Sequence, residues 1–336
     1  MPVVNPVWYQ DYPNDSPSSR FTNIVYDGNN KNVVLFGGYY GRTAKLSYND
    51  TWIWNGNNWI QKFPSESPSS RAFYLITYDD NNKNVLLFGG VSYNDTWIWD
   101  GNNWIQKFPT NSPLNQSSPI TMTYDYNNKN VVLLGDNNDT WTWDGNNWTQ
   151  KFPTNSPDIN ITGTMSYDHI NKNVVLFGGV TLLNSIPRVL NTTYIWDGNI
   201  WIQKFPVNFP TIRSYSSSTY DFYSQSVILF AGLNIIDSKD SIYYNDTWSW
   251  DGNNWTQIIT SIFPSLRVSN ITYDSNNNNI VLFGGVYGID IFNNQTWIYT
   301  SNNTSNNISN NTSNIIIFKE MFKISEKCFY YKIYFL

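Results

Sequence analysis

The chain has 336 residues and a formal net charge of −5; 13% of its residues are charged and 18% are aromatic. This composition excludes disorder for most of the chain, because disorder goes with few aromatic residues and many charges. The negative charge argues against a nucleic acid partner, since phosphate binding needs a basic surface. With one cysteine, Cys328, and one histidine, His169, the chain cannot form an internal disulfide or a Cys/His zinc site, and we expect no cofactor.

The first residues, MPVVNPVWYQDYPND, contain neither a basic segment nor a long apolar run, so we expect no signal peptide. No run of about 18 apolar residues without charges occurs, so we expect no membrane-spanning helix. These two features predict a cytoplasmic protein.

From the start of the chain onward, one sequence unit recurs six times, every 43 to 54 residues. Its most regular part is rich in tryptophan, as in NDTWIWNGNNWIQKFP (49–64), NDTWIWDGNNWIQKFP (94–109) and NDTWTWDGNNWTQKFP (138–153). A Tyr-Asp pair, a polar turn and an apolar run precede it, as in YDGNNKNVVLFGG (26–38). Such a period is typical of repeat architectures.

Each unit predicts four short strands. The first ends at Tyr-Asp, the second is the buried apolar run (33–38), the third is the alternating TWIW (51–54), and the fourth begins at Trp59. An Asn-rich turn joins the first strand to the second, and an Asp-Gly or Asn-Gly turn joins the third to the fourth, because these residues tolerate left-handed backbone. Four antiparallel strands per unit predict an all-β fold, a six-bladed β-propeller.

The predicted propeller spans residues 5–300. Residues 301–314 are an Asn/Ser/Thr-rich linker, and 315–336 form an apolar tail that contains lysine. The predicted blades are 16–64, 67–109, 112–153, 156–206, 209–260, and 263–300 together with 5–13.

Counting aromatic residues indicates how the ring closes. The third and fourth strands offer three aromatic positions per blade, and tryptophans with Tyr194 and Tyr299 fill all but the last. The unplaced Trp8 lies in NPVWYQDYP, which matches NNWIQKFP. We therefore expect residues 5–13 to be the fourth strand of the last blade, which removes the open edges of the ring.

The paired glycines after the second strand, the aromatic third strand and the tryptophan about seven residues later resemble kelch repeats. The resemblance implies a kelch-type propeller of the galactose oxidase superfamily, a fold that hosts binding modules and enzymes alike. The copper site of galactose-oxidase-like members needs two histidines and a tyrosine cross-linked to a cysteine. This chain has only His169 and Cys328, so we expect no such metal site.

Residues that recur in every blade are best explained by the blade itself. We assign turn formation to the aspartates after the first-strand tyrosines, and packing between blades to the tryptophans. His169 is interpreted as an exposed turn residue. These aspartates are Asp27, Asp79, Asp125, Asp168, Asp221 and Asp274. No catalytic constellation is then left, and the sequence favours a role without catalysis.

Antiparallel strands place the two turns of every blade on one face of the disc. This turn face repeats DGNN and NNKN and looks monotonous. The other face, the connection face, carries the links between blades and the connections between second and third strands. Those connections are short in blades 2 and 3 and long in the other blades (39–48, 180–190, 233–244 and 286–292).

Binding residues favour variable loops on a rigid scaffold, so we predict the site on the connection face. Its loop candidates are Tyr39, Tyr40, Arg42, Arg188, Asp237, Lys239, Asp240 and Asp290. Four arginines near the first strands, Arg20, Arg71, Arg213 and Arg267, could hold carboxylates around a mouth. The alternative is that each arginine pairs with an aspartate or a carbonyl of a neighbouring blade.

Two functions remain open at this point. The first is a protein-interaction scaffold that binds a protein or peptide through the connection face. The second is a carbohydrate-binding or sugar-isomerising protein that resembles kelch-type sialic acid mutarotases, with the four arginines and Asp290 as its polar groups.

Overall fold

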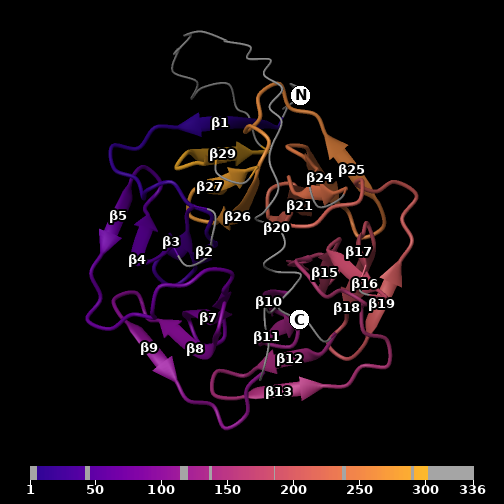
Figure 1. The fold of residues 1–336 in the computed structure, drawn as a ribbon, viewed down its shortest axis with the longest axis horizontal. Helices are drawn as coiled ribbons and strands as arrows, with labels where there is room; N and C mark the ends of the chain where they lie inside the picture. Colours follow the sequence, from indigo (N-terminus) through magenta and orange to yellow (C-terminus); the bar gives the residue numbers. More distant parts are fainter. Residues whose placement is uncertain are drawn as a thin grey trace.

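Six antiparallel sheets surround a central axis like the blades of a propeller (Figure 1). The computed structural model describes residues 6–41, 46–113, 120–135, 138–184, 186–236, 240–288 and 291–301, and these ranges contain no helix. The described residues therefore include no helix that could cross a membrane. The predicted linker from 302 onward and the tail 315–336 lie outside them. The all-β, six-bladed prediction is confirmed.

Each blade has four strands in chain order. Blade 1 comprises β2 (Ile24–Asp27), β3 (Asn32–Tyr39), β4 (Ser47–Trp54) and β5 (Trp59–Lys62), and blade 2 comprises β6 (Leu75–Asp79), β7 (Asn84–Gly90), β8 (Tyr93–Trp99) and β9 (Trp104–Lys107). Blade 3 comprises β10 (Thr121–Asp125), β11 (Asn130–Leu134), β12 (Thr140–Trp143) and β13 (Trp148–Lys151).

The next two blades each carry an additional hairpin on the connection face. Blade 4 comprises β14 (Thr164–Asp168), β15 (Asn173–Phe177), β18 (Thr193–Trp196) and β19 (Trp201–Lys204), with the hairpin β16 (Val180–Leu183) and β17 (Ile186–Val189). Blade 5 comprises β20 (Ser217–Asp221), β21 (Ser226–Phe230), β24 (Thr247–Trp250) and β25 (Trp255–Ile258), with the hairpin β22 (Leu233–Ile235) and β23 (Ser241–Tyr243).

The two ends of the described chain meet in blade 6. It comprises β26 (Val268–Asp274), β27 (Asn279–Tyr287) and β29 (Thr296–Thr300), with β28 (Ile291–Phe292) paired to β27 and β1 (Val7–Asp11) as its outer strand. Strand β1 pairs with β29 so that Trp8 lies opposite Tyr299. The innermost strands β2 and β26 are also in contact, so the ring is closed (Figure 1). The predicted closure by the N-terminal strand is confirmed.

A belt of hydrogen bonds joins each blade to the one before it. The indole of the tryptophan in every fourth strand donates to the threonine that directly precedes the first Trp or Tyr of the aromatic pair in the preceding blade's third strand. The pairs, all at 2.9–3.0 Å, are Trp59–Thr296, Trp104–Thr51, Trp148–Thr96, Trp201–Thr140, Trp255–Thr193 and Trp8–Thr247. Trp8 thus takes the same place in blade 6 as its five counterparts take in theirs.

The hydrophobic core lies between consecutive blades. In blade 1 the second-strand residues Val33, Val34, Leu35 and Phe36 are 0% exposed, because neighbouring blades cover both faces of the sheet. Phe36 packs with Trp104 of blade 2 at 5.1 Å between ring centroids. The tryptophans of the third and fourth strands therefore fill the space between blades, as predicted.

The polar turns fit together across the turn face. Asp27 Oδ1 accepts from the backbone N–H groups of Asn29 and Asn30, and its Oδ2 accepts from the Asn30 side chain. Gly56, in the turn between β4 and β5, has φ +100°, and a Cβ there would lie 2.6 Å from Asn277 Nδ2 of blade 6. Only glycine fits this conformation and this close approach. The turn aspartates are structural, as predicted.

Candidate functional site

The connection face is built from the long loops, and four of the six blades raise strand pairs from it. Besides the two hairpins of blades 4 and 5, Gly38 and Tyr39 pair with Tyr48 and Ser47 in blade 1. In blade 6, β27 continues into a pairing with β28. The connections of the six blades therefore differ, and this face is asymmetric.

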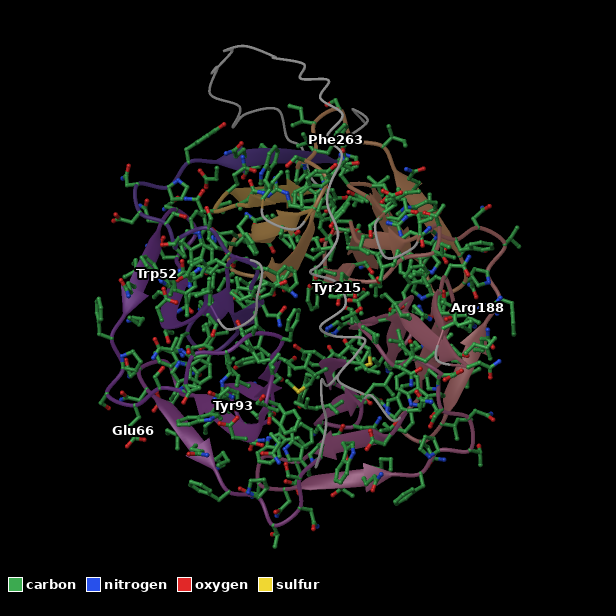
Figure 2. All side chains as sticks on the ribbon, in the orientation of Figure 1. Trp52, Glu66, Tyr93, Arg188, Tyr215 and Phe263 are labelled. Carbon is green, nitrogen blue, oxygen red and sulfur yellow. The ribbon has the colours of Figure 1, made fainter. Side chains whose placement is uncertain are left out.

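Four of the predicted loop residues can be placed on these hairpins. Tyr39 is half-buried and packs on Phe73 and Phe292 at 5.0 and 5.7 Å, so it belongs to a structural aromatic cluster. Tyr40 is 38% exposed and lies against Tyr48. Arg188 on β17 is exposed at the periphery of the disc (Figure 2).

Asp240, just before β23, is also exposed. The other loop candidates, Arg42, Asp237, Lys239 and Asp290, lie outside the described residues.

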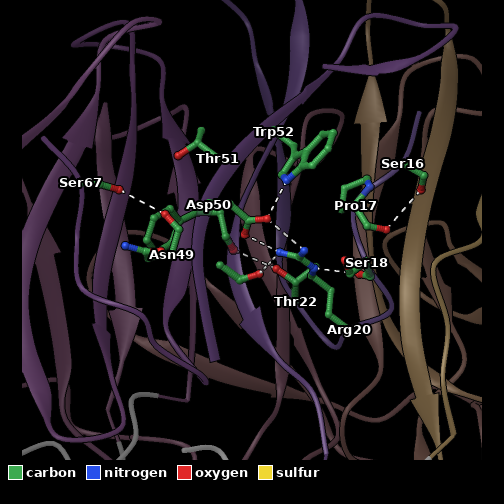
Figure 3. Close-up of polar contacts among 12 residues, drawn as sticks. Ser16, Pro17, Ser18, Arg20, Thr22, Asn49, Asp50, Thr51, Trp52 and Ser67 are labelled. Carbon is green, nitrogen blue, oxygen red and sulfur yellow. Dashed lines mark hydrogen bonds and ion pairs between the residues drawn. The ribbon is translucent and has the colours of Figure 1, made fainter. Parts of the chain in front are cut away.

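The four arginines do not form an open group around a mouth, because each side chain is buried and engaged. Arg20 lies under the Tyr48 ring and binds both oxygens of Asp50, at 2.5 and 3.0 Å (Figure 3). Arg71 holds Asp95 in the same way, and Arg213 holds Asp246. The partner lies in the arginine's own blade, not in the neighbouring blade that the alternative expected.

We call these three arginine–aspartate pairs the arginine clamps, and the clamps of blades 2 and 5 change the pKa of the aspartate. Burial alone would raise the pKa of Asp95, but the hydrogen bonds from Arg71 and Trp97 and the charge of Arg71 outweigh it, so the pKa is lowered. The same balance lowers the pKa of Asp246 beside Arg213.

Arg267 differs from the other three arginines, because Gln295 takes the place of the aspartate and accepts from Nη2 at 2.6 Å. Burial lowers the pKa of Arg267 to about 10.

A cavity of about 490 Å³ follows the axis of the propeller, and residues of all six first strands line it. Much of its wall is hydroxyl and amide, for example Asn23, Thr123, Ser218 and Thr272. Thr164 and Ser218 hydrogen-bond to each other across two blades at 2.9 Å. A volume in this range is typical of small-ligand sites.

At the turn face, each blade contributes to the cavity wall the residue that follows the Tyr-Asp pair at the end of its first strand. In blade order these residues are Gly28, Asp80, Tyr126, His169, Phe222 and Ser275. The His169 ring lies between Tyr126 and Phe222, at 4.4 and 4.5 Å between centroids. We call Tyr126, His169 and Phe222 the aromatic crescent.

His169 is half-buried in this crescent, which corrects the prediction of an exposed turn residue. Its ring also contacts Tyr167 and Tyr220, at 4.9 and 4.8 Å. Burial lowers the pKa of His169, although Asp168 and Asp80 act in the opposite direction. The imidazole is therefore neutral at pH 7.

The prediction missed the crescent because it treated the turn face as monotonous. The signal was present in the sequence: the residue after the turn aspartate differs in every blade, although blades 1 to 3 share the rest of the turn, D-x-N-N-K-N. A position that varies while the rest of the turn stays the same, as in blades 1 to 3, is not needed by the turn itself.

Aromatic residues also gather at the connection-face end of the cavity. Phe73 and Tyr215 have φ of +56° and +54°, which is uncommon for residues with a side chain. Both line the cavity, and Figure 2 shows Tyr215 near the axis. No group of three or more metal-binding side chains occurs among the residues that the structure describes.

The fold and the axial cavity define a six-bladed β-propeller. No family model matches the chain, and no curated protein matches it. The solved structure of YjhT is similar, with a TM-score of 0.61 and 13% identity, and the match covers 83% of this chain and 95% of that one. At this identity the similarity shows the fold alone, and the resemblance to kelch repeats stays a prediction.

Proposed function

We propose that this chain is a scaffold that binds a partner protein on the part of the connection face formed by blades 4 to 6. The observation that carries the proposal is a concentration of exposed apolar side chains there, which we call the apolar sector. Its members are Leu183, Ile186, Val207, Phe209, Ile236, Ile242, Ile259, Ile262, Phe263 and Ile291, with exposures from 47% to 84%.

The apolar sector is not a general property of the connection face. The links that follow blades 1 to 3 begin FPSESPSS (63–70), FPTNSP (108–113) and FPTNSPD (152–158), which are polar after the phenylalanine. The links after blades 4 and 5 read FPVNFPTI (205–212) and IITSIFPSL (258–266). Folding does not require this difference, since all of these links join the same elements.

Contacts between neighbouring blades link the elements that carry the sector. Arg213 N–H, at the end of one apolar link, donates to the Leu190 carbonyl beside the hairpin β16–β17 at 2.9 Å. Tyr243 on β23 packs on Tyr287 of blade 6 at 4.7 Å. Figure 2 places Phe263 and Arg188 at the periphery of this half of the disc. Exposed apolar side chains gathered on one part of a surface are typical of protein interaction sites.

The carbohydrate alternative remains a proposal with less support. It relied on four arginines around a mouth, and the side chains of Arg20, Arg71, Arg213 and Arg267 are buried in contacts within the protein. A glycan array tests it directly.

The scaffold proposal is tested by comparing variants in partner capture. We would identify partners of the wild-type chain by crosslinking and mass spectrometry, and then measure the affinity of the purified partner. Ile186→Asp and Val207→Asp place charges on side chains that are 65% and 84% exposed, so folding should be unaffected.

Each of these two changes should weaken binding at least about tenfold. The matched control is Phe63→Asp, at a side chain that is 83% exposed on blade 1. Equal binding by all three variants would reject the apolar sector as the docking surface.

A further inference from the structure

A ring of buried carboxylates surrounds the turn-face mouth of the axial cavity, whereas the lysines of the same turns, Lys31, Lys83, Lys129 and Lys172, are exposed at the surface. The six turn aspartates are at most 2% exposed. The hydrogen bonds that they accept come from neutral groups: in blade 2, for example, Asp79 accepts from two backbone N–H groups and the Asn82 amide. A seventh carboxylate, Asp80, lines the mouth itself. Such an arrangement gives the mouth a negative potential.

The tyrosines in the mouth respond to this charge. Burial and then the charge of Asp27 raise the pKa of Tyr78, and burial and then Asp80 raise that of Tyr126. Burial and then Asp125 raise the pKa of Tyr167 to about 12. The charge of the carboxylates therefore adds to the effect of burial on these hydroxyls.

The described lining of the cavity contains no lysine or arginine. Lys83 binds Asp80 Oδ1 at 2.9 Å, but this pair is at the surface, where the lysine side chain is 58% exposed. Since His169 is neutral at pH 7, the described lining of the mouth carries no positive charge, and Lys83 pairs with Asp80 only from the surface.

The aromatic crescent supplies the complementary surface. Tyr126 and Phe222 keep 40% and 48% of their surface exposed on either side of His169. The turn does not require these rings, because Gly28 and Ser275 take the same position in blades 1 and 6. The Tyr78 hydroxyl, in a residue that is 8% exposed and lines the cavity, makes no hydrogen bond of ordinary geometry within the protein.

We propose that the turn-face mouth of the axial cavity, formed by Asp80 and the aromatic crescent, binds an alkylated ammonium group. The negative faces of aromatic rings attract cations, and they suit a methylated ammonium, which is large and weakly hydrated. Asp80 supplies a counter-charge beside the rings. The group can belong to a free small molecule or to a methylated lysine of a protein, and both share the trimethylammonium chemistry.

The test compares a cation with its neutral isostere on the full chain. Calorimetric titrations would use choline, the uncharged 3,3-dimethylbutan-1-ol, and a peptide that contains trimethyl-lysine. We expect choline to bind saturably, with a Kd on the order of 1 mM or tighter, and the neutral alcohol to bind at least about tenfold more weakly. Binding of the peptide but not of choline would assign the site to a protein ligand and keep the ammonium chemistry.

Variants locate the binding. Asp80→Asn and Phe222→Ala should each weaken choline binding at least about fivefold without lowering the melting temperature. Ser275→Ala, at the same turn position in blade 6, is the control and should bind as the wild type does. Equal binding of choline and the neutral alcohol overturns the proposal, as does binding of a neutral sugar without choline or the absence of binding by choline and the peptide.

Discussion

The arginine clamps allow a sharp prediction about stability, and Asp95→Asn in blade 2 tests it. The Arg71 side chain is 1% exposed and that of Asp95 is 19% exposed. Asp95 accepts from Arg71 at 2.5 and 3.0 Å and from the Trp97 indole at 2.7 Å. Asparagine keeps the shape but removes the charge, and it turns one acceptor into a donor that faces another donor.

The expected cost follows from the burial of the arginine. Removing one member of a buried ion pair costs about 3–5 kcal/mol, because the remaining charge stays uncompensated. Since Asp95 retains some contact with water, we expect about 3 kcal/mol. For a domain of this size that corresponds to a decrease of about 6 °C in Tm.

Urea denaturation at pH 7 measures the effect, with Lys83→Ala as the control. The Lys83–Asp80 pair is exposed, at 58% and 39%, so its loss should change the free energy of unfolding by less than about 0.5 kcal/mol. An Asp95→Asn variant within about 1 kcal/mol of the wild type would refute the account of the clamp.

The stability difference between the wild type and Asp95→Asn should depend on pH in a defined direction. Folding lowers the pKa of Asp95 from 3.8, so its contribution is present above that value and is lost as the pH falls through the lower pKa of the folded state. The stability of the variant and of the wild type should therefore converge below about pH 4.

Three further predictions concern other parts of the ring. Trp8→Ala should destabilise the protein by about 3–5 kcal/mol in urea denaturation, because Trp8 is 0% exposed and closes the belt, whereas Tyr9→Ala, at a residue 44% exposed on the same strand, should change little. Gln295→Glu should raise the free energy of unfolding by about 1 kcal/mol, and with it the urea midpoint, because it gives the buried Arg267 a counter-charge. An unchanged or lower midpoint would show that Arg267 needs no counter-charge. Burial holds the pKa of His169 below 6.5, so its contribution to stability is complete above that pH and declines as the pH falls below it; His169→Gln should flatten this part of the stability profile measured between about pH 5 and 7.

The fold could be predicted because the repeat carries its own internal checks. The position of Trp8 followed from counting aromatic residues, and the structure gives it the same indole-to-threonine bond as its five counterparts. The role of the turn aspartates followed in the same way, from their presence in every blade.

The arginines were misassigned for a physical reason. Arg71 precedes β6 and Asp95 lies on β8, 24 residues later, so only the assembled blade brings their side chains together. Sequence spacing placed the arginines near a mouth but could not show that the guanidinium groups point into the blade. The variable turn position and the apolar links were visible in the sequence. They were missed because the sequence analysis compared the two faces as wholes and did not compare equivalent positions from blade to blade.

Hydrogen–deuterium exchange of the protein, alone and with its captured partner, tests the central claim most directly, because it shows which face the partner covers. The account predicts slower exchange in the hairpin β16–β17 and in the links 205–212 and 258–266, with no change in the links 64–70 and 109–113. Slower exchange confined to the turn face, or spread evenly over the links of all blades, would contradict it.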